Sequence, residues 1–267
     1  MLWSGLLLIG VYAPLLAGLA RQWGTDPDMS HGFFVLPVVA FVVWRRRGEL
    51  APIEGKPEAK PNWWGLAIVA WGAAQMLLGT LAAQVFIART AFLVSLAGAV
   101  LFLGGTRALK IMAFPLLLLL FLFPMPAMVY ARVTLPLQIF ASAAAETVLN
   151  WIGIPVLRDG NILELPHGRL SVVEACSGIR SLLSLAFLSL VYAYFFDRRV
   201  AMRWVLLGAT VPIAIAANAF RITLMGLFGL EGASHLFEGW VLFVVALSLL
   251  VTLHLGLCRC LIAQRSS

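Results

Sequence analysis

The 267-residue chain is 62% hydrophobic and only 12% charged, whereas soluble domains are about half apolar and a quarter charged. This composition excludes a soluble protein, and most of the length is needed to cross a bilayer. The net charge of +7 could suggest a nucleic-acid partner. We exclude that class because the basic residues fall in short clusters between apolar runs, a pattern typical of membrane topology.

Eight apolar runs predict about eight transmembrane helices. The first lacks a basic n-region and a clear cleavage site, so we interpret it as a retained helix rather than a signal peptide. The second is short for a hydrocarbon core of about 30 Å. The runs cover residues 2–20, 32–44, 63–81, 85–103, 111–130, 178–196, 204–220 and 239–257.

The basic residues predict the orientation. Twelve of the nineteen Lys and Arg residues lie on one set of loops, together with only four acids. By the positive-inside rule this side is cytoplasmic, and eight spans place both termini there. The fold class is therefore an all-α integral membrane protein. The twelve are Arg45, Arg46, Arg47, Lys56, Lys60, Arg107, Lys110, Arg198, Arg199, Arg203, Arg259 and Arg265.

The longest segment on the opposite, extracytoplasmic side is residues 131–177. Its first half, 135–153, has apolar residues at helical spacing but no span-length apolar core, which predicts an amphipathic helix lying at the membrane interface. Its second half predicts a short β-meander. Asp159-Gly160 is typical of a tight turn, and Pro166-His167-Gly168 indicates a second one.

This insert ends at Cys176, which has charged residues close to it on both sides in the sequence. Cys176 comes just before Ser177 and Gly178, which open the sixth predicted helix. The positive end of a helix dipole lowers the pKa of a thiol. Arg180, four residues on, favours the thiolate, while Glu174 opposes it. A structural cysteine is the alternative interpretation.

Two further helix ends on the same side carry polar residues. Asn218 and Arg221 are three apart and share a face at the end of the seventh predicted helix. His235 lies in the following loop, and Glu238 lies at the start of the eighth helix. Cys176, Arg221 and His235 are thus predicted at one membrane depth. A snorkelling arginine and a solvated histidine are the alternatives.

Several stretches resemble the exosortase family of integral membrane cysteine transpeptidases. They are EACSGIRSL (174–182), NAFRI (218–222) with a histidine before the last helix, DMSHGFFVLPVVAFVVWRRR (28–47), PLQ (136–138) and GIPV with DGNILELP (153–166). The resemblance covers nearly the whole chain and implies a single domain over residues 1–267. The additional C-terminal domain of some members is not expected here.

The resemblance implies a sorting enzyme of the inner membrane with its active site on the extracytoplasmic face. Such enzymes recognise exported proteins by a C-terminal tail with a Pro-Glu-Pro motif, a transmembrane helix and a basic cluster. It also implies that Cys176 is the nucleophile, with Arg221 and His235 completing the site. Archaeal relatives are described with an arginine in the last role.

The family describes its arginine as a proton donor, but a guanidinium rarely gives up a proton because its pKa exceeds about 12. We therefore expect Arg221 to stabilise the thiolate and the oxyanion, and His235 to move the proton. Glu238 could orient His235, and Asn218 could donate to the oxyanion or pack between helices. Arg180 could hold Glu174 or bind the acidic substrate motif.

His31, at the outer start of the second helix, could line the site or cap the interface. The sequence predicts no metal and no organic cofactor. Two other functions stay open: an acyl or glycosyl transferase acting on lipid-linked substrates, and a non-enzymatic transporter or assembly subunit of polysaccharide export. Clustered Asp, Glu or His ligands on the outer loops would favour the first, and polar residues in mid-membrane would favour the second.

Overall fold

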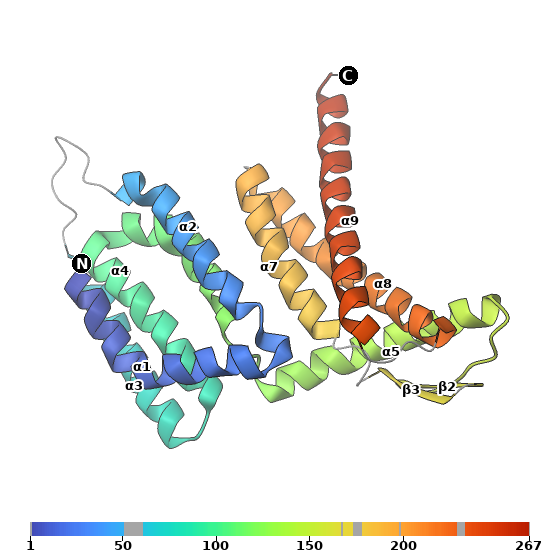
Figure 1. Cartoon of the computed structure of the whole chain (residues 1–267). Helices are drawn as coiled ribbons and strands as arrows, with labels where there is room; N and C mark the ends of the chain where they lie inside the picture. The colour runs from blue at the N-terminus through green and yellow to red at the C-terminus, as the bar shows by residue number, and fades with distance from the viewer. Residues whose placement is uncertain are drawn as a thin grey trace. The chain divides into compact units, whose positions relative to one another are not determined.

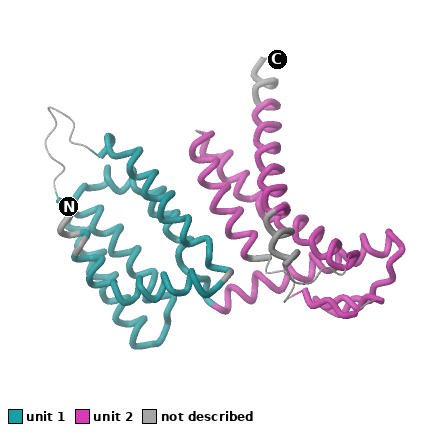
Figure 2. The backbone as a smooth tube through the Cα atoms, viewed as in Figure 1, with its two compact units in different colours: residues 1–126 teal, residues 127–267 magenta. Residues whose placement is uncertain are grey.

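The computed structural model describes residues 2–50, 61–166, 168–172, 178–197, 199–228 and 233–266. The chain divides into two compact units, residues 1–126 and residues 127–267, which are coloured separately in Figure 2. Each unit has its own helix packing. The elements of the two units are therefore given separately.

The first unit is entirely helical in its described part (Figure 1). The predicted run at 63–81 matches α3 to the residue. The run at 2–20 lies within the longer α1, and the run at 32–44 begins α2. In chain order the elements are α1 (Leu2–Thr25), the 3₁₀ turn η1 (Pro27–Met29), α2 (Gly32–Leu50), α3 (Trp63–Leu81), α4 (Val85–Leu119) and the 3₁₀ turn η2 (Leu120–Leu122).

Helix α4 contains the fourth predicted helix and the first part of the fifth. It bends at Gly105, whose φ of 66° and ψ of −171° are non-helical and are readily adopted only by glycine. The second arm then runs beside α2 (Figure 1). The prediction that the fifth helix continues to residue 130 is wrong. Helix α4 ends at Leu119, and the chain passes Pro124 and Pro126, which cannot continue an α-helix, before the next helix begins.

Three long-range hydrogen bonds fix the direction of this second arm. Near one end of α2, Arg46 Nη1 donates to the carbonyl oxygen of Ile111 at 2.7 Å, and Arg107 Nη2 donates to that of Glu49 at 2.8 Å. At the other end, His31 donates to the carbonyl oxygen of Phe121 at 3.0 Å. The two arginine clusters therefore lie at one end of this unit, as the positive-inside pattern predicts.

Glycines let α3 approach the first arm of α4 closely. Gly65, Gly72 and Gly79 recur every seven residues along α3, and all three are buried. A Cβ atom at Gly65 would lie 2.6 Å from the carbonyl oxygen of Gly98. Such small-residue contacts are the usual basis of helix association in lipid, where apolar burial provides no driving force.

The second unit combines long helices with a small sheet (Figure 1). The predicted run at 178–196 matches α7 to the residue, whereas the runs at 204–220 and 239–257 lie inside longer helices. The elements are α5 (Ala127–Trp151), β1 (Leu157–Asp159), β2 (Ile162–Leu165), β3 (Gly168–Ser171), α7 (Gly178–Phe196), α8 (Val200–Phe228) and α9 (Ala233–Ser266).

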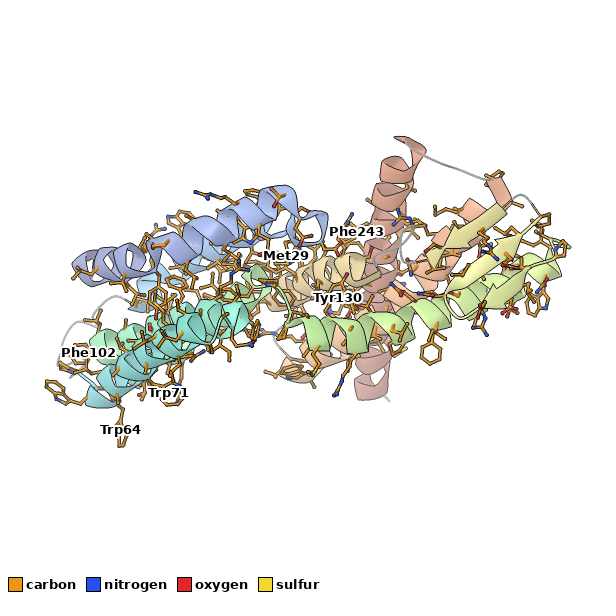
Figure 3. All side chains as sticks on the ribbon, turned by 90° about the horizontal axis from the view of Figure 1, so that it is seen from below. Met29, Trp64, Trp71, Phe102, Tyr130 and Phe243 are labelled. Atoms are coloured by element: carbon orange, nitrogen blue, oxygen red, sulfur yellow. The ribbon has the colours of Figure 1, made fainter. Side chains whose placement is uncertain are left out.

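Helix α5 begins at Ala127, eight residues before the predicted start of the interfacial helix. It runs transverse to α9 in both views (Figures 1 and 3). Its buried face consists of small or polar residues and one leucine. Of the apolar residues whose helical spacing predicted this helix, Phe140 and Val148 are exposed and Ala141 is buried. By length and composition α5 could span a bilayer, so the interfacial placement stays a prediction. The buried residues are Thr134, Gln138, Ala141, Ser142, Ala145 and Leu149.

The predicted β-meander is confirmed. Strands β1, β2 and β3 pair antiparallel in that order. Asp159 pairs with Ile162, so the first loop is Gly160-Asn161, with Gly160 at a φ of 60°. Leu165 pairs with Gly168 around the second predicted turn, of which His167 lies outside the described residues. Leu163 and Val172 belong to a hydrophobic cluster with residues of α5 and α8, which fastens the sheet to the helices.

Asp197 organises the turn between α7 and α8. Its side chain is 4% exposed, and Arg199 forms a fork on it with contacts of 3.0 and 2.6 Å. These hydrogen bonds from Arg199 hold the pKa of the Asp197 carboxyl well below its usual range. Arg203 donates to the backbone carbonyl of Asp197 at 3.1 and 3.0 Å. Arg199 therefore compensates the buried carboxylate, while Arg203 holds the backbone of the turn.

The burial pattern is that of a membrane protein. Large apolar side chains such as Trp64, Trp71 and Phe34 are exposed, while polar ones such as Ser95 and Ser189 are buried. By length and composition, five helical segments are long and apolar enough to cross a membrane, and Arg180–Phe196 is a shorter apolar helix. An all-α membrane protein is therefore confirmed for the described residues.

We predict that Gly65→Ala destabilises the first unit. The added methyl group would press on the backbone of α4 at Phe102 and Gly98, and overpacking typically costs about 1–3 kcal/mol. The measurement is the thermal unfolding midpoint in detergent. Gly10→Ala on α1, where the methyl group would meet nothing within 4 Å, is the matched control and should leave the midpoint unchanged or raise it. Equal midpoints for the two variants would contradict the close approach.

We also predict a pH dependence from His31, which is buried in the turn before α2. Burial lowers the pKa of its imidazole, so the unfolded chain takes up the proton more readily. The resulting stability is present above the unfolded-state pKa of about 6.5 and is lost as the pH falls below it. The unfolding midpoint of the wild type should fall between pH 7 and 5, and His31→Gln should flatten that fall. Parallel pH profiles for the two proteins would refute this assignment.

Candidate functional site

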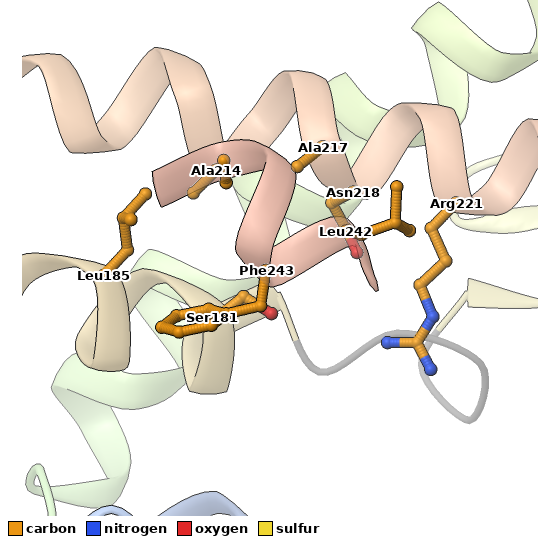
Figure 4. Close-up of a pocket in the computed structure, with 9 residues that line it drawn as sticks. Ser181, Leu185, Ala214, Ala217, Asn218, Arg221, Leu242 and Phe243 are labelled. Atoms are coloured by element: carbon orange, nitrogen blue, oxygen red, sulfur yellow. The ribbon is translucent and has the colours of Figure 1, made fainter. Parts of the chain in front are cut away.

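A small cavity lies between α7, α8 and α9 in the second unit (Figure 4). Its volume is about 20 Å³, which is room for one water-sized group. Three polar side chains reach an otherwise apolar lining. The lining residues are Ser181, Leu185, Ala214, Ala217, Asn218, Arg221, Leu242, Phe243 and Ala246.

Asn218 and Arg221 project from the same side of α8 (Figure 4), as their spacing of three residues predicts. Asn218 is buried and Arg221 is half-buried. Both residues line the cavity.

The position of Arg221 along its helix differs from the prediction. The sequence placed it at the end of the seventh helix, but α8 continues to Phe228, seven residues further. At 1.5 Å per residue this is about two helical turns. The end of α8 is helical beyond Arg221 because the face opposite the cavity is buried. On that face Ala219, Ile222 and Met225 belong to one hydrophobic cluster with residues of α5 and the sheet. The last turns of α8 thus have one face for packing and one for the cavity.

Ser181 is a polar lining residue that the sequence analysis missed. It lies in the first turn of α7, which begins at Gly178 as predicted. Its signal in the sequence is weak, because a serine near the start of a helix is common and only the fold brings it to Asn218 and Arg221. Arg180, next to it, is exposed and is not among the cavity residues.

The side chains of four predicted site residues lie outside the described part of the structure. Cys176 and Glu174 lie outside the described residues, as do the side chains of His235 and Glu238. The backbone corrects one prediction: α9 begins at Ala233, so position 235 lies on the helix and not in the preceding loop. Nothing in the sequence Ala-Ser-His-Leu-Phe-Glu breaks a helix, which permits this early start.

Both flanks of the cysteine segment meet the same part of α8. Before it, Val172 belongs to the hydrophobic cluster that contains Ala219 and Ile222. After it, Ser181 lines the cavity with Asn218 and Arg221. The chain between these anchors, residues 173–180, includes Cys176. His31 belongs to the first unit and is held by the carbonyl oxygen of Phe121.

The chemistry available to the cavity is that of hydrogen-bond donation to an anion. A guanidinium, an amide and a hydroxyl reach one water-sized space whose other walls are apolar. Charges and donors act more strongly in such surroundings than in water. A developing oxyanion is the kind of group that this set can stabilise.

Comparison with known proteins gives one match. The family described as transmembrane exosortase matches residues 23–252. No curated protein and no solved structure matches the chain. The matched region contains the whole cavity and the cysteine segment, and it covers most of the chain, so the protein belongs to the transmembrane exosortase family.

Proposed function

We infer that the protein is a membrane-embedded cysteine transpeptidase that cleaves the C-terminal sorting tail of exported proteins. The substrate would carry a Pro-Glu-Pro motif, a transmembrane helix and a basic cluster. The observation that carries this proposal is the pair of anchors around Cys176. Val172 and Ser181 flank its segment, and both belong to groups that include the 218–222 stretch of α8, where Asn218 and Arg221 line the cavity.

The proposed reaction starts with the Cys176 thiolate. Its sulfur attacks the scissile carbonyl carbon, and the carbonyl oxygen becomes an oxyanion. Arg221 and Asn218 donate hydrogen bonds to that oxyanion, for which a cavity of about 20 Å³ suffices. Collapse of the intermediate breaks the C–N bond, and the leaving amine takes from His235 the proton that the Cys176 thiol gave up. The acyl group, held as a thioester on Cys176, then passes to an acceptor nucleophile, which gives its proton to His235, and the C–S bond breaks to restore the thiolate.

A membrane-anchored substrate explains why the enzyme needs no large binding cavity. The tail of the substrate is itself a transmembrane helix, so docking in the plane of the bilayer would bring the cleavage site to the level of the membrane surface. Only the reacting carbonyl must then enter the cavity. Family membership supports this interpretation over a transferase for lipid-linked substrates or a transporter.

We predict that the nucleophile is Cys176 and no other thiol. The protein is co-expressed with an exported, tagged reporter that ends in a Pro-Glu-Pro motif, an apolar helix and a basic cluster. The wild type should shorten the reporter on a gel and Cys176→Ala should not. Cys260→Ala, at an exposed cysteine, is the matched control and should cleave normally. Cleavage by Cys176→Ala would exclude the cysteine mechanism and favour the transferase or transporter alternatives.

We predict a graded response at Arg221. Arg221→Ala should lower the cleavage rate about 100-fold or more, as the loss of an oxyanion donor does. Arg221→Lys keeps the charge but loses the planar fork, so it should retain an intermediate rate. Arg132→Ala, at an exposed arginine of α5 in the same unit, is the control. If Arg221→Ala folds and cleaves as fast as the control, Arg221 has no part in the reaction.

A further inference from the structure

A second cluster of polar side chains lies far along the helices from the cavity. It joins the turn between α7 and α8 to the C-terminal half of α9. Its members are Asp197, His254 and Cys258. On α9 the cavity residues end at Ala246, so more than two helical turns separate the two places.

The three side chains converge on one point. His254 Nε2 lies 3.1 Å from Asp197 Oδ2 and 3.3 Å from Cys258 Sγ, and the sulfur lies 3.8 Å from the same carboxylate oxygen. Asp197 and His254 are almost fully buried, with side chains 4% and 6% exposed. Such a buried set of oxygen, nitrogen and sulfur donors costs free energy unless a cation or hydrogen bonds compensate it.

This geometry is not that of a catalytic relay. In a relay the carboxylate and the nucleophile occupy opposite nitrogens of the imidazole. Here both approach Nε2 of His254, and Nδ1 is taken by the hydroxyl of Tyr192 at 2.9 Å. The cluster therefore has the arrangement of ligands around a common centre.

The separations fit a tetrahedral metal. Zinc bonds of about 2.0–2.3 Å to oxygen, nitrogen and sulfur at tetrahedral angles place neighbouring ligand atoms about 3.3–3.7 Å apart. The three separations in the cluster, 3.1, 3.3 and 3.8 Å, lie close to this range. We propose that Asp197, His254 and Cys258 form a three-ligand site for a divalent transition-metal ion of the zinc type, which fastens α9 to the turn between α7 and α8.

Two neighbours fit the roles that such a site needs. The Tyr192 hydroxyl oxygen can accept a hydrogen bond from Nδ1–H of His254, which fixes the tautomer that leaves Nε2 for the metal. The Tyr192 ring also stacks on Phe196 at 4.8 Å. Without metal, Arg199 supplies the positive charge: its Nη2 lies 2.6 Å from Asp197 Oδ2 and 2.9 Å from Cys258 Sγ. Because the Arg199 side chain is 46% exposed, it can swing into solvent.

When the metal ion binds, it replaces two positive charges: the proton of Cys258 and the guanidinium of Arg199. Cys258 releases its proton to solvent and coordinates as a thiolate, His254 coordinates as the neutral imidazole, and the guanidinium of Arg199 leaves the carboxylate. Three protein ligands leave a fourth position for water. By the positive-inside pattern, this end of the unit is the one predicted to face the cytoplasm, where thiols stay reduced.

The first test uses cobalt(II) as a spectroscopic stand-in for zinc. The full-length protein is purified in detergent with an affinity tag that contains no histidine, stripped with a chelator and titrated with cobalt. The wild type should develop thiolate-to-cobalt charge transfer together with intense visible bands typical of tetrahedral geometry. Cys258→Ser should lose the charge transfer, while Cys260→Ser should keep it. No cobalt spectrum in the wild type, or a spectrum lost only in Cys260→Ser, would overturn the proposal.

Two variants separate a metal site from an ion-pair network held by Arg199. Arg199→Ala removes the competing cation, so it should bind cobalt and zinc more tightly than the wild type, and zinc should raise its thermal midpoint more. Tyr192→Phe keeps the ring but should weaken binding about tenfold. A network without metal predicts the opposite at Arg199: lower stability, and no effect of zinc on the midpoint of either protein. That result would refute the site even if Cys258→Ser failed to fold.

Discussion

The structure depends on the bilayer as a solvent, which lets large apolar side chains remain on the surface. Trp64 and Phe34 are exposed, while the interior contains polar residues such as Ser95 and Ser189 beside its apolar clusters. Because lipid gives apolar residues no reason to leave the surface, the helices associate through close backbone contact and internal hydrogen bonds. The three glycines at seven-residue spacing on α3 allow such close backbone contact in the first unit. The alanines at positions 141, 145 and 219 allow it in the second unit.

This arrangement also explains how a polar site can exist inside the second unit. The end of α8 is covered on one face by α5 and the sheet, which satisfies its apolar residues without lipid. The other face is then available for Asn218 and Arg221, and alanines at 214 and 217 leave space for the cavity. The β-meander therefore supports the site mechanically, since it anchors the chain just before the cysteine segment against the same stretch of helix.

Helices α7, α8 and α9 carry polar chemistry at both of their ends. One end holds the cavity and the other holds the buried carboxylate, imidazole and thiol. Between them lies an apolar cluster of Ala193, Met202, Leu206 and Leu250. A contact that fastens α9 at its far end also fixes the helix that begins near the proposed catalytic histidine, because a packed helix transmits displacement along its length.

The sequence alone determined the membrane class, the bounds of α3 and α7 and the β-meander, because hydropathy runs and Gly-containing turns are local signals. It also placed Asn218 and Arg221 on one face, and EACSG identified the family later shown for residues 23–252. Only the tertiary structure decided that α8 extends past Arg221, that Ser181 meets it, and that His254 and Cys258 face Asp197. These features depend on contacts between residues far apart in the chain. Packing there overrides the local sequence pattern, and the spacing of apolar residues in one segment does not indicate which distant residue it contacts.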